Sequence, residues 1–174
     1  MIKSLVKVLI YFVLFVSVQV IVLNNINLFR IATPFLYLYI ILKIPVNVNR
    51  TSIIAISFLL GIVIDVFSNT LGIHAAACSL AGMIRNPLMY SFSGKEFAED
   101  ASPSYRTLGT VAFMKYVIVL VVAHHILLFL IESIALFDPV FLIFRIFANV
   151  FLTVLFVLII EAFNMERKDK SIKN

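Results

Sequence analysis

A few ionisable side chains lie inside long apolar stretches of this sequence, and they set the chemistry that the chain could perform. Asp65 follows an uncharged run over residues 53–64, Glu132 ends a second apolar run, and Arg145 lies early in a third. A charge at the centre of a bilayer costs about 2.5 to 3.5 kcal/mol on insertion scales, and less near an interface. Each of these residues therefore needs a partner, either elsewhere in the protein or on a bound molecule.

Glu132 and Arg145 are placed to meet across a helical hairpin. Glu132 lies six residues before Asp138 and Arg145 seven after it, so antiparallel helices would hold both roughly 10 Å below the turn, as an ion pair. His125 and Asn149 continue the same two helical faces at spacings of seven and four residues. The four residues could form one polar seam, which would serve either as interhelical contact worth about 1 kcal/mol per hydrogen bond or as a proton or ion path.

Asp65 belongs to a stretch that predicts two closely packed helices. Gly61 precedes it by one helical turn on the same face and lets a neighbouring helix approach. After a polar turn that ends at Gly72, small residues extending to Gly82 favour tight packing. Asp65 could accept hydrogen bonds from that turn, pair with Arg145, or contact a solute or a partner helix.

No catalytic or metal-binding pattern accompanies these residues. The sequence contains no glycine-rich nucleotide loop, no His-Glu-x-x-His motif and no Gly-x-Ser-x-Gly motif. His124 and His125 are adjacent, so on a helix they point about 100° apart and would chelate one ion poorly. Cys78 is the only cysteine, which excludes an internal disulfide. We therefore expect no enzymatic activity, no cofactor and no metal.

The composition is that of an integral membrane protein with several spans. The 174 residues are 63% hydrophobic and 13% charged, with a mean hydropathy of +1.11, whereas a soluble domain is about half apolar and a quarter charged. The formal net charge is +5, but the basic residues lie at the ends of apolar runs. There they favour orientation in the membrane and attraction to anionic lipids, and they do not indicate nucleic acid.

The apolar runs predict an all-α bundle of six transmembrane helices over residues 1–164, followed by a charged cytoplasmic tail over 165–174 that frays. Thr33 is a candidate N-cap for the second helix and Pro34 its first residue. That helix is short, so it would need snorkelling by Lys43, local thinning of the bilayer or an oblique path. The hydrophilic stretch 91–108 is expected to be a solvated loop. The six predicted spans cover residues 5–23, 34–44, 49–67, 71–89, 109–131 and 140–163.

Orientation follows from the basic residues. With both termini in the cytoplasm, every Lys and Arg of the 14 in the chain falls toward the inner side except Arg30 and Arg145. Arg85 and Lys43 belong to the inner set in this arrangement. The strong bias supports six crossings of the cytoplasmic membrane.

On these residues the chain resembles the bacterial rod-shape-determining protein MreD family. The similarity rests on size, on six predicted spans with Pro34 opening the second, and mainly on the stretch that contains Gly61, Asp65, Leu71 and Gly72. The family pattern there is Gly-x-x-x-Asp, a short polar turn, and Leu-Gly before a helix of small residues.

The resemblance implies a non-enzymatic scaffold subunit of the complex that elongates the bacterial cell wall and sets cell shape. The implied partners are MreC, MreB, RodA and the transpeptidase that works with RodA, together with the lipid bilayer. The implied fold is similar to that of the substrate-binding subunits of energy-coupling-factor vitamin transporters.

That fold supplies an alternative function, the binding of a small solute for transport. The polar pocket would then face outward, lined by Asp65 and the polar seam. Against it, the first span is bulky, whereas those subunits tend to carry small residues there. Binding of a lipid-linked precursor in the same cavity is compatible with either function.

Overall fold

The computed structural model describes residues 2–23, 32–94, 97, 101–134 and 137–172, and within this part of the chain every regular element is a helix. Arg30, expected on the outer side, lies outside the described residues. The helices are α1 (Ile2–Ile21), α2 (Leu38–Lys43), α3 (Arg50–Ser68), α4 (Ile73–Ser93), α5 (Tyr105–Leu108), α6 (Thr110–Glu132) and α7 (Pro139–Ile172).

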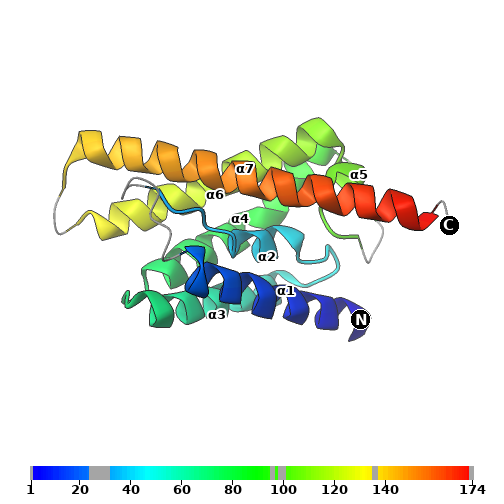
Figure 1. Cartoon of the computed structure of the whole chain (residues 1–174), viewed down its shortest axis with the longest axis horizontal. Coiled ribbons are helices and arrows are strands. Elements are labelled where there is room, and N and C mark those ends of the chain that lie inside the picture. The colour runs from blue at the N-terminus through cyan, green and yellow to red at the C-terminus, as the bar shows by residue number, and fades with distance from the viewer. Residues whose placement is uncertain (1, 24–31, 95–96, 98–100, 135–136, 173–174) are drawn as a thin grey trace.

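The long helices run roughly parallel or antiparallel to one another, and the short helix α2 lies among them (Figure 1). Helix α4 packs mainly against α3 and α6, and α7 packs against α6. The start of α1 and the end of α7 lie at one end of the molecule, here called the terminal end (Figure 1). The opposite end, called the turn end, carries the connections from α3 to α4 and from α6 to α7.

Three of the described helices are long and apolar enough to cross a membrane: α3, α6 and the Pro139–Asn164 part of α7. Helix α7 leaves a row of phenylalanines on its surface, as expected of a helix that faces lipid. The composition of the chain and these helices together indicate a membrane protein. The exposed residues of this row are Phe141, Phe144, Phe147, Phe151 and Phe163.

The second predicted span is not a spanning helix. Residues 33–35 are not helical, and α2 has only six residues, so Pro34 does not open a helix and Thr33 does not cap one. The segment is nevertheless deeply buried, since every residue from Leu38 to Leu42 is at most 2% exposed. Backbone without helical hydrogen bonds is tolerated in such a place only when other groups satisfy it.

Side chains from α1 and α7 satisfy the backbone N–H groups at the start of this segment. The amide oxygen of Asn149 accepts from Thr33 N at 2.8 Å, and Gln19 Oε1 accepts from Leu36 N at 2.8 Å. Between them, Thr153 Oγ1 accepts from Phe35 N at 3.0 Å. The local sequence predicts a continuous helix here, because it does not reveal these partners from other helices.

Side chains from α4 and α6 satisfy the carbonyls at the end of the segment. Arg85 donates from Nε to Ile41 O at 2.9 Å and from Nη2 to Ile44 O, and Tyr116 donates to Leu42 O at 3.2 Å. Arg85, which the orientation prediction counts in the inner set, is fully buried. Its guanidinium supplies the donors that the end of α2 requires.

Snorkelling by Lys43, one of the three alternatives for the short second span, does not occur, because the Lys43 side chain is buried against α7. Its Nζ lies 3.0 Å from Glu161 Oε1, and the two side chains are 9% and 2% exposed. Nζ also donates to Pro103 O at 2.5 Å, and Tyr39 donates to Glu161 Oε2 at 2.7 Å. The cluster binds α2 to α7 near the terminal end.

Helix boundaries in the second half of the chain differ from the predictions in two places. Helix α4 continues through Pro87 to Ser93, and α7 continues to Ile172, past the predicted start of the tail at residue 165. Helix α7 starts at Pro139, one residue before the predicted span, and Asp138 Oδ1 accepts from the N–H groups of Val140 and Phe141 at 3.0 and 3.1 Å.

The stretch 91–108 is not only a solvated loop. Ser104 and Thr107 form a capping box that starts α5. Tyr105 packs edge-on against Phe113 with ring centroids 4.8 Å apart, and Leu108 is buried. Burial raises the pKa of Tyr105 above its ordinary value, and the nearby Glu161 carboxylate adds to the shift.

Candidate functional site

Asp65 connects α3 to the start of α4. Its Oδ1 accepts from Thr70 Oγ1 at 2.5 Å and from His74 N at 3.0 Å, and its Oδ2 accepts from Ala75 N at 2.9 Å. The carboxylate thus satisfies two N–H groups at the positive end of α4, where a negative charge is favourable. Of the alternatives predicted for Asp65, the structure shows hydrogen bonds from the turn, and Asp65 does not pair with Arg145, which pairs with Glu132.

Gly72 is the residue that makes this connection necessary. It occupies the N-cap position of α4 with φ +77° and has no side chain to cap the helix. Asp65 supplies the missing cap from the preceding helix. Gly72 itself adopts a left-handed conformation that residues with side chains rarely adopt.

Gly61 and Gly82 let α3 and α4 approach until their backbones touch. A Cβ atom on Gly61 would lie 2.4 Å from Ala75 Cα, and one on Gly82 would lie 2.5 Å from Ser57 Oγ. The predicted small-residue packing is present in this hairpin. Gly61, Asp65, Gly72 and Gly82 therefore act together as one structural unit.

We expect Asp65→Ala to lower the amount of folded protein in the membrane. The substitution removes the cap of α4, and losing a helix cap costs up to about 2 kcal/mol. The measurement is the abundance of membrane-inserted, protease-resistant protein, with Asp65→Asn as the conservative comparison, because its Oδ1 still accepts hydrogen bonds. Unchanged abundance of Asp65→Ala with lost activity would contradict this role and indicate contact with a ligand or partner.

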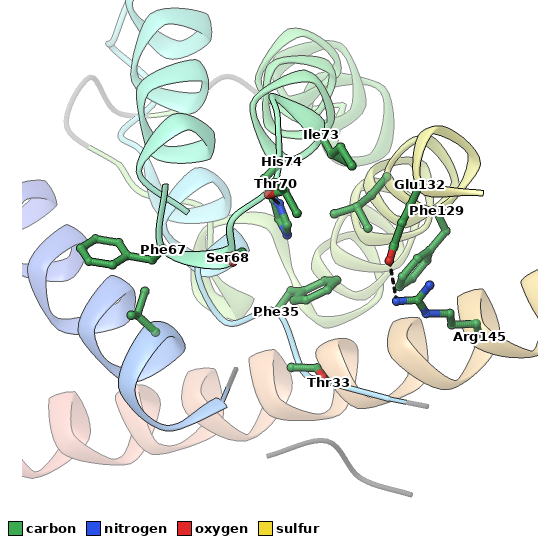
Figure 2. A pocket seen from close by; sticks show the side chains of 12 residues that line it. Thr33, Phe35, Phe67, Ser68, Thr70, Ile73, His74, Phe129, Glu132 and Arg145 are labelled. Atoms are coloured by element: carbon green, nitrogen blue, oxygen red, sulfur yellow. Dashed lines mark hydrogen bonds and ion pairs between the residues drawn. The ribbon is translucent and has the colours of Figure 1, made fainter. Parts of the chain in front are cut away.

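A pocket of about 460 Å³ opens at the turn end between α1, α3, α4, α6 and α7. In Figure 2, Glu132 and Arg145 lie at one side of the pocket and Phe67 at the other, with Phe35 and His74 between them. The volume is in the range of small-molecule sites. The pocket is lined by Val20, Thr33, Phe35, Phe67, Ser68, Thr70, Ile73, His74, Leu128, Phe129, Glu132 and Arg145.

The predicted pairing of Glu132 with Arg145 is present in the structure. Arg145 Nη2 lies 2.9 Å from Glu132 Oε1, and the two side chains are 33% and 38% exposed. The guanidinium also lies over the ring of Phe129, 4.5 Å from its centroid, a favourable arrangement of a cation on an aromatic face. The pair therefore presents both charges to the pocket in a fixed orientation.

His125 and Asn149 do not continue this pair into one seam. His125 hydrogen-bonds the carbonyl of Val121 through Nδ1 at 2.8 Å, and Nε2 lies 3.4 Å from Thr153 Oγ1. Asn149 donates to Arg145 O within α7 and accepts from Thr33 N. The non-helical segment that holds Thr33 enters between α6 and α7, so the predicted seam is interrupted, and both residues have structural roles.

The three histidines of the chain gather around Phe35 and Tyr37 beneath the pocket. Phe35 stacks on His125 at 5.2 Å and lies 6.0 Å from the ring of His74. Tyr37 Oη lies 3.2 Å from His124 Nε2. Among the described residues, His124 Nδ1 is one of two buried polar side-chain atoms without a hydrogen-bond partner. Phe35 closes the floor of the pocket above this cluster.

Several important residues were not recognised as a group from the sequence. His74 lines the pocket and lies within 3.1 Å of Asp65, and Thr153 and Glu161 hold the buried segment. The one available signal was spacing, since Asn149 and Thr153 lie four residues apart and Glu161 eight residues further on the same face of α7. This spacing does not predict that a non-helical segment lies along that face of α7.

The pocket is lined by charged, polar and aromatic side chains. No group of three or more His, Cys, Asp or Glu residues suited to a metal ion occurs in the part of the chain that the structure describes. The pocket instead combines one cation, one anion, several hydroxyls and aromatic rings.

Comparison with known proteins gives no family, since no family model, no curated protein and no solved structure matches the chain.

Proposed function

We propose that the protein is a non-enzymatic membrane scaffold of the bacterial cell-wall elongation complex. The proposal is supported by the structural roles of the residues on which the resemblance to MreD rests. Asp65 and Gly61 are occupied in joining α3 to α4, while Leu71 at the tip of this connection is fully exposed. Such an arrangement suits a rigid surface that a partner contacts, and it leaves Asp65 with its hydrogen bonds already filled.

The proposed partners are MreC, MreB, RodA and the transpeptidase that works with RodA. Exposed apolar residues on a rigid turn are suited to contact another protein. Leu71 lies in the turn between α3 and α4 and is 100% exposed, and Val66, at the end of α3, is 71% exposed. In a rod-shaped bacterium, depletion of the protein is expected to cause loss of rod shape, and the tagged protein is expected to co-purify with MreC.

The Leu71 surface can be tested separately from folding. We expect Leu71→Asp to reduce co-purification of MreC without lowering the abundance of the protein, because Leu71 has no buried contact to lose. Ile134→Asp is the matched control, since Ile134 is 80% exposed at the connection that follows α6. Equal recovery of MreC with wild type and Leu71→Asp would exclude this surface as the contact.

We further propose six crossings of the cytoplasmic membrane with both termini in the cytoplasm. Asn149 and Glu161, which contact Thr33 and Lys43 respectively, are 12 residues apart, or about 18 Å along α7. The segment from Thr33 to Lys43 therefore covers a large part of the bilayer depth, although only its second half, Leu38–Lys43, is helical.

A phosphatase reporter fused after Asn174 is expected to be inactive, because such enzymes need the oxidising periplasm, and a fluorescent reporter at the same position is expected to be active. A matching fusion within residues 133–138 should give the reverse result. Phosphatase activity at the C-terminus would refute the arrangement.

One observation favours the alternative function, a solute-binding subunit of a transporter. The pocket at the turn end has the volume and the mixed polar and aromatic lining of a small-molecule site. A nutrient requirement on depletion that is rescued by supplementation, with cell shape unchanged, would favour this alternative over the scaffold.

A further inference from the structure

The pocket at the turn end has a charge arrangement that restricts what it can bind. Its lining contains one permanent cation, Arg145, and the carboxylate of Glu132. His74 also lines the pocket, and its Nδ1 lies 3.1 Å from Asp65 Oδ1 behind the wall. The two fully charged groups that face the pocket cancel, so neither a net anion nor a net cation is favoured by the lining as a whole.

Glu132 and Arg145 retain hydrogen-bonding capacity after they pair. Their contact uses Arg145 Nη2 and Glu132 Oε1, whereas a guanidinium carries five N–H donors and a carboxylate two acceptor oxygens. Both side chains are about one third exposed. A ligand that carries an acidic group and an ammonium a few ångströms apart could engage both residues at once.

The position of Arg145 is fixed before a ligand arrives. The guanidinium rests on the face of Phe129 at 4.5 Å from the ring centroid and donates to Glu132 Oε1 at 2.9 Å. Preorganised charges bind a ligand at lower cost in conformational entropy than mobile ones. The ion pair thus resembles a prepared recognition site more than an unconstrained surface contact.

The remaining lining suits an amphipathic ligand. Phe35 and Phe67 supply aromatic surface, and the polar residues Thr33, Ser68 and Thr70 also line the pocket, with the Thr70 hydroxyl already donating to Asp65. The pocket lies at the end of α7 that carries the exposed Phe144, so a lipid headgroup could reach it from the side of the bilayer.

We propose that this pocket binds a zwitterionic group, with the acidic part on Arg145 and the ammonium on Glu132. The group belongs either to a free amino acid or to the ethanolamine phosphate headgroup of a phospholipid. The inference does not depend on the scaffold role, because a scaffold or a solute-binding subunit could use such a site.

The test uses the full chain purified in detergent and then placed in nanodiscs. Native mass spectrometry measures the retention of phosphatidylethanolamine and of phosphatidylglycerol, which is anionic and has no ammonium. A thermal-shift titration with L-leucine measures binding of a soluble zwitterion. The variants are Arg145→Gln and Glu132→Gln, with Lys115→Gln as the control, since Lys115 is exposed on α6 and does not line the pocket.

Preferred retention of phosphatidylethanolamine would support the headgroup as the ligand, provided that either pocket variant lowers the retention about tenfold or more and the control does not. The size of this loss follows from the energy of hydrogen bonds to charged groups. Binding of L-leucine with the same variant pattern and no lipid preference would support a soluble ligand. Preferred phosphatidylglycerol, insensitivity to Glu132→Gln, or no binding of any probe would overturn the proposal. Each variant is first checked for an unchanged melting temperature without ligand, and Glu132→Met and Arg145→Met replace any variant that fails.

Discussion

Gly61→Val is expected to remove nearly all folded protein from the membrane. Even the first atom of a side chain at this position would lie 2.4 Å from Ala75 Cα and 2.6 Å from His74 O, which are backbone atoms of α4. Ordinary overpacking of a core costs about 1 to 3 kcal/mol because side chains move aside. Here α4 itself would have to move, and that movement would separate Asp65 from the N–H groups that it caps.

Two comparisons make the Gly61 result specific. Gly82→Ala should have a smaller effect, because its two closest atoms belong to the Ser57 side chain and the nearest backbone atom, Ile53 O, lies 3.3 Å away. Ala55→Val, on the exposed side of the same helix, should leave abundance unchanged. The measurements are the yield of monodisperse protein in detergent and its melting temperature. A yield of Gly61→Val equal to that of Ala55→Val would disprove the close contact between α3 and α4.

The second large effect is expected at Lys43 and Glu161. Each single variant, Lys43→Met or Glu161→Leu, should lower the free energy of unfolding by about 3 to 5 kcal/mol, because it leaves the other charge buried without its partner. The side chains are 9% and 2% exposed, so water cannot compensate well.

The double variant Lys43→Met/Glu161→Leu should be more stable than either single variant, because it buries no charge. A thermal or chemical denaturation cycle of the four proteins measures this coupling. Lys115→Met on the exposed side of α6 controls for the loss of a lysine. Additive effects of the two substitutions would mean that the pair does not interact as described.

The helical character and the placement of several local features could be read from the sequence because they depend on nearby residues. Asp138 caps α7, Asn49 caps α3 through Ser52 N at 2.7 Å, and Gly61 faces α4 at one turn from Asp65. The contact between Glu132 and Arg145 was also predictable, because both lie close to the same hairpin connection. In each case spacing along one or two adjacent helices determines the geometry.

The segment between Thr33 and Ile44 could not be predicted, because its conformation depends on distant residues. Apolar composition and Pro34 indicate a helix when local preference alone is considered. The non-helical path is stabilised by Asn149 and Thr153, more than 100 residues away. The burial of Arg85 has the same cause, since only the presence of free carbonyls at the end of α2 makes a buried guanidinium favourable.

The dependence of this segment on α7 also constrains how the protein is made. The backbone N–H groups of Thr33 and Phe35 donate to residues 116 and 118 positions later in the chain. The Tyr39 hydroxyl donates to a residue 122 positions later. Unsatisfied backbone groups in hydrocarbon cost several kcal/mol each. During translation the segment therefore has no stable place in the lipid until α7 has emerged from the ribosome. Until then we expect the segment to remain at the membrane–water interface or inside the membrane insertion machinery. We also expect membrane quality control to recognise nascent chains that lack α7.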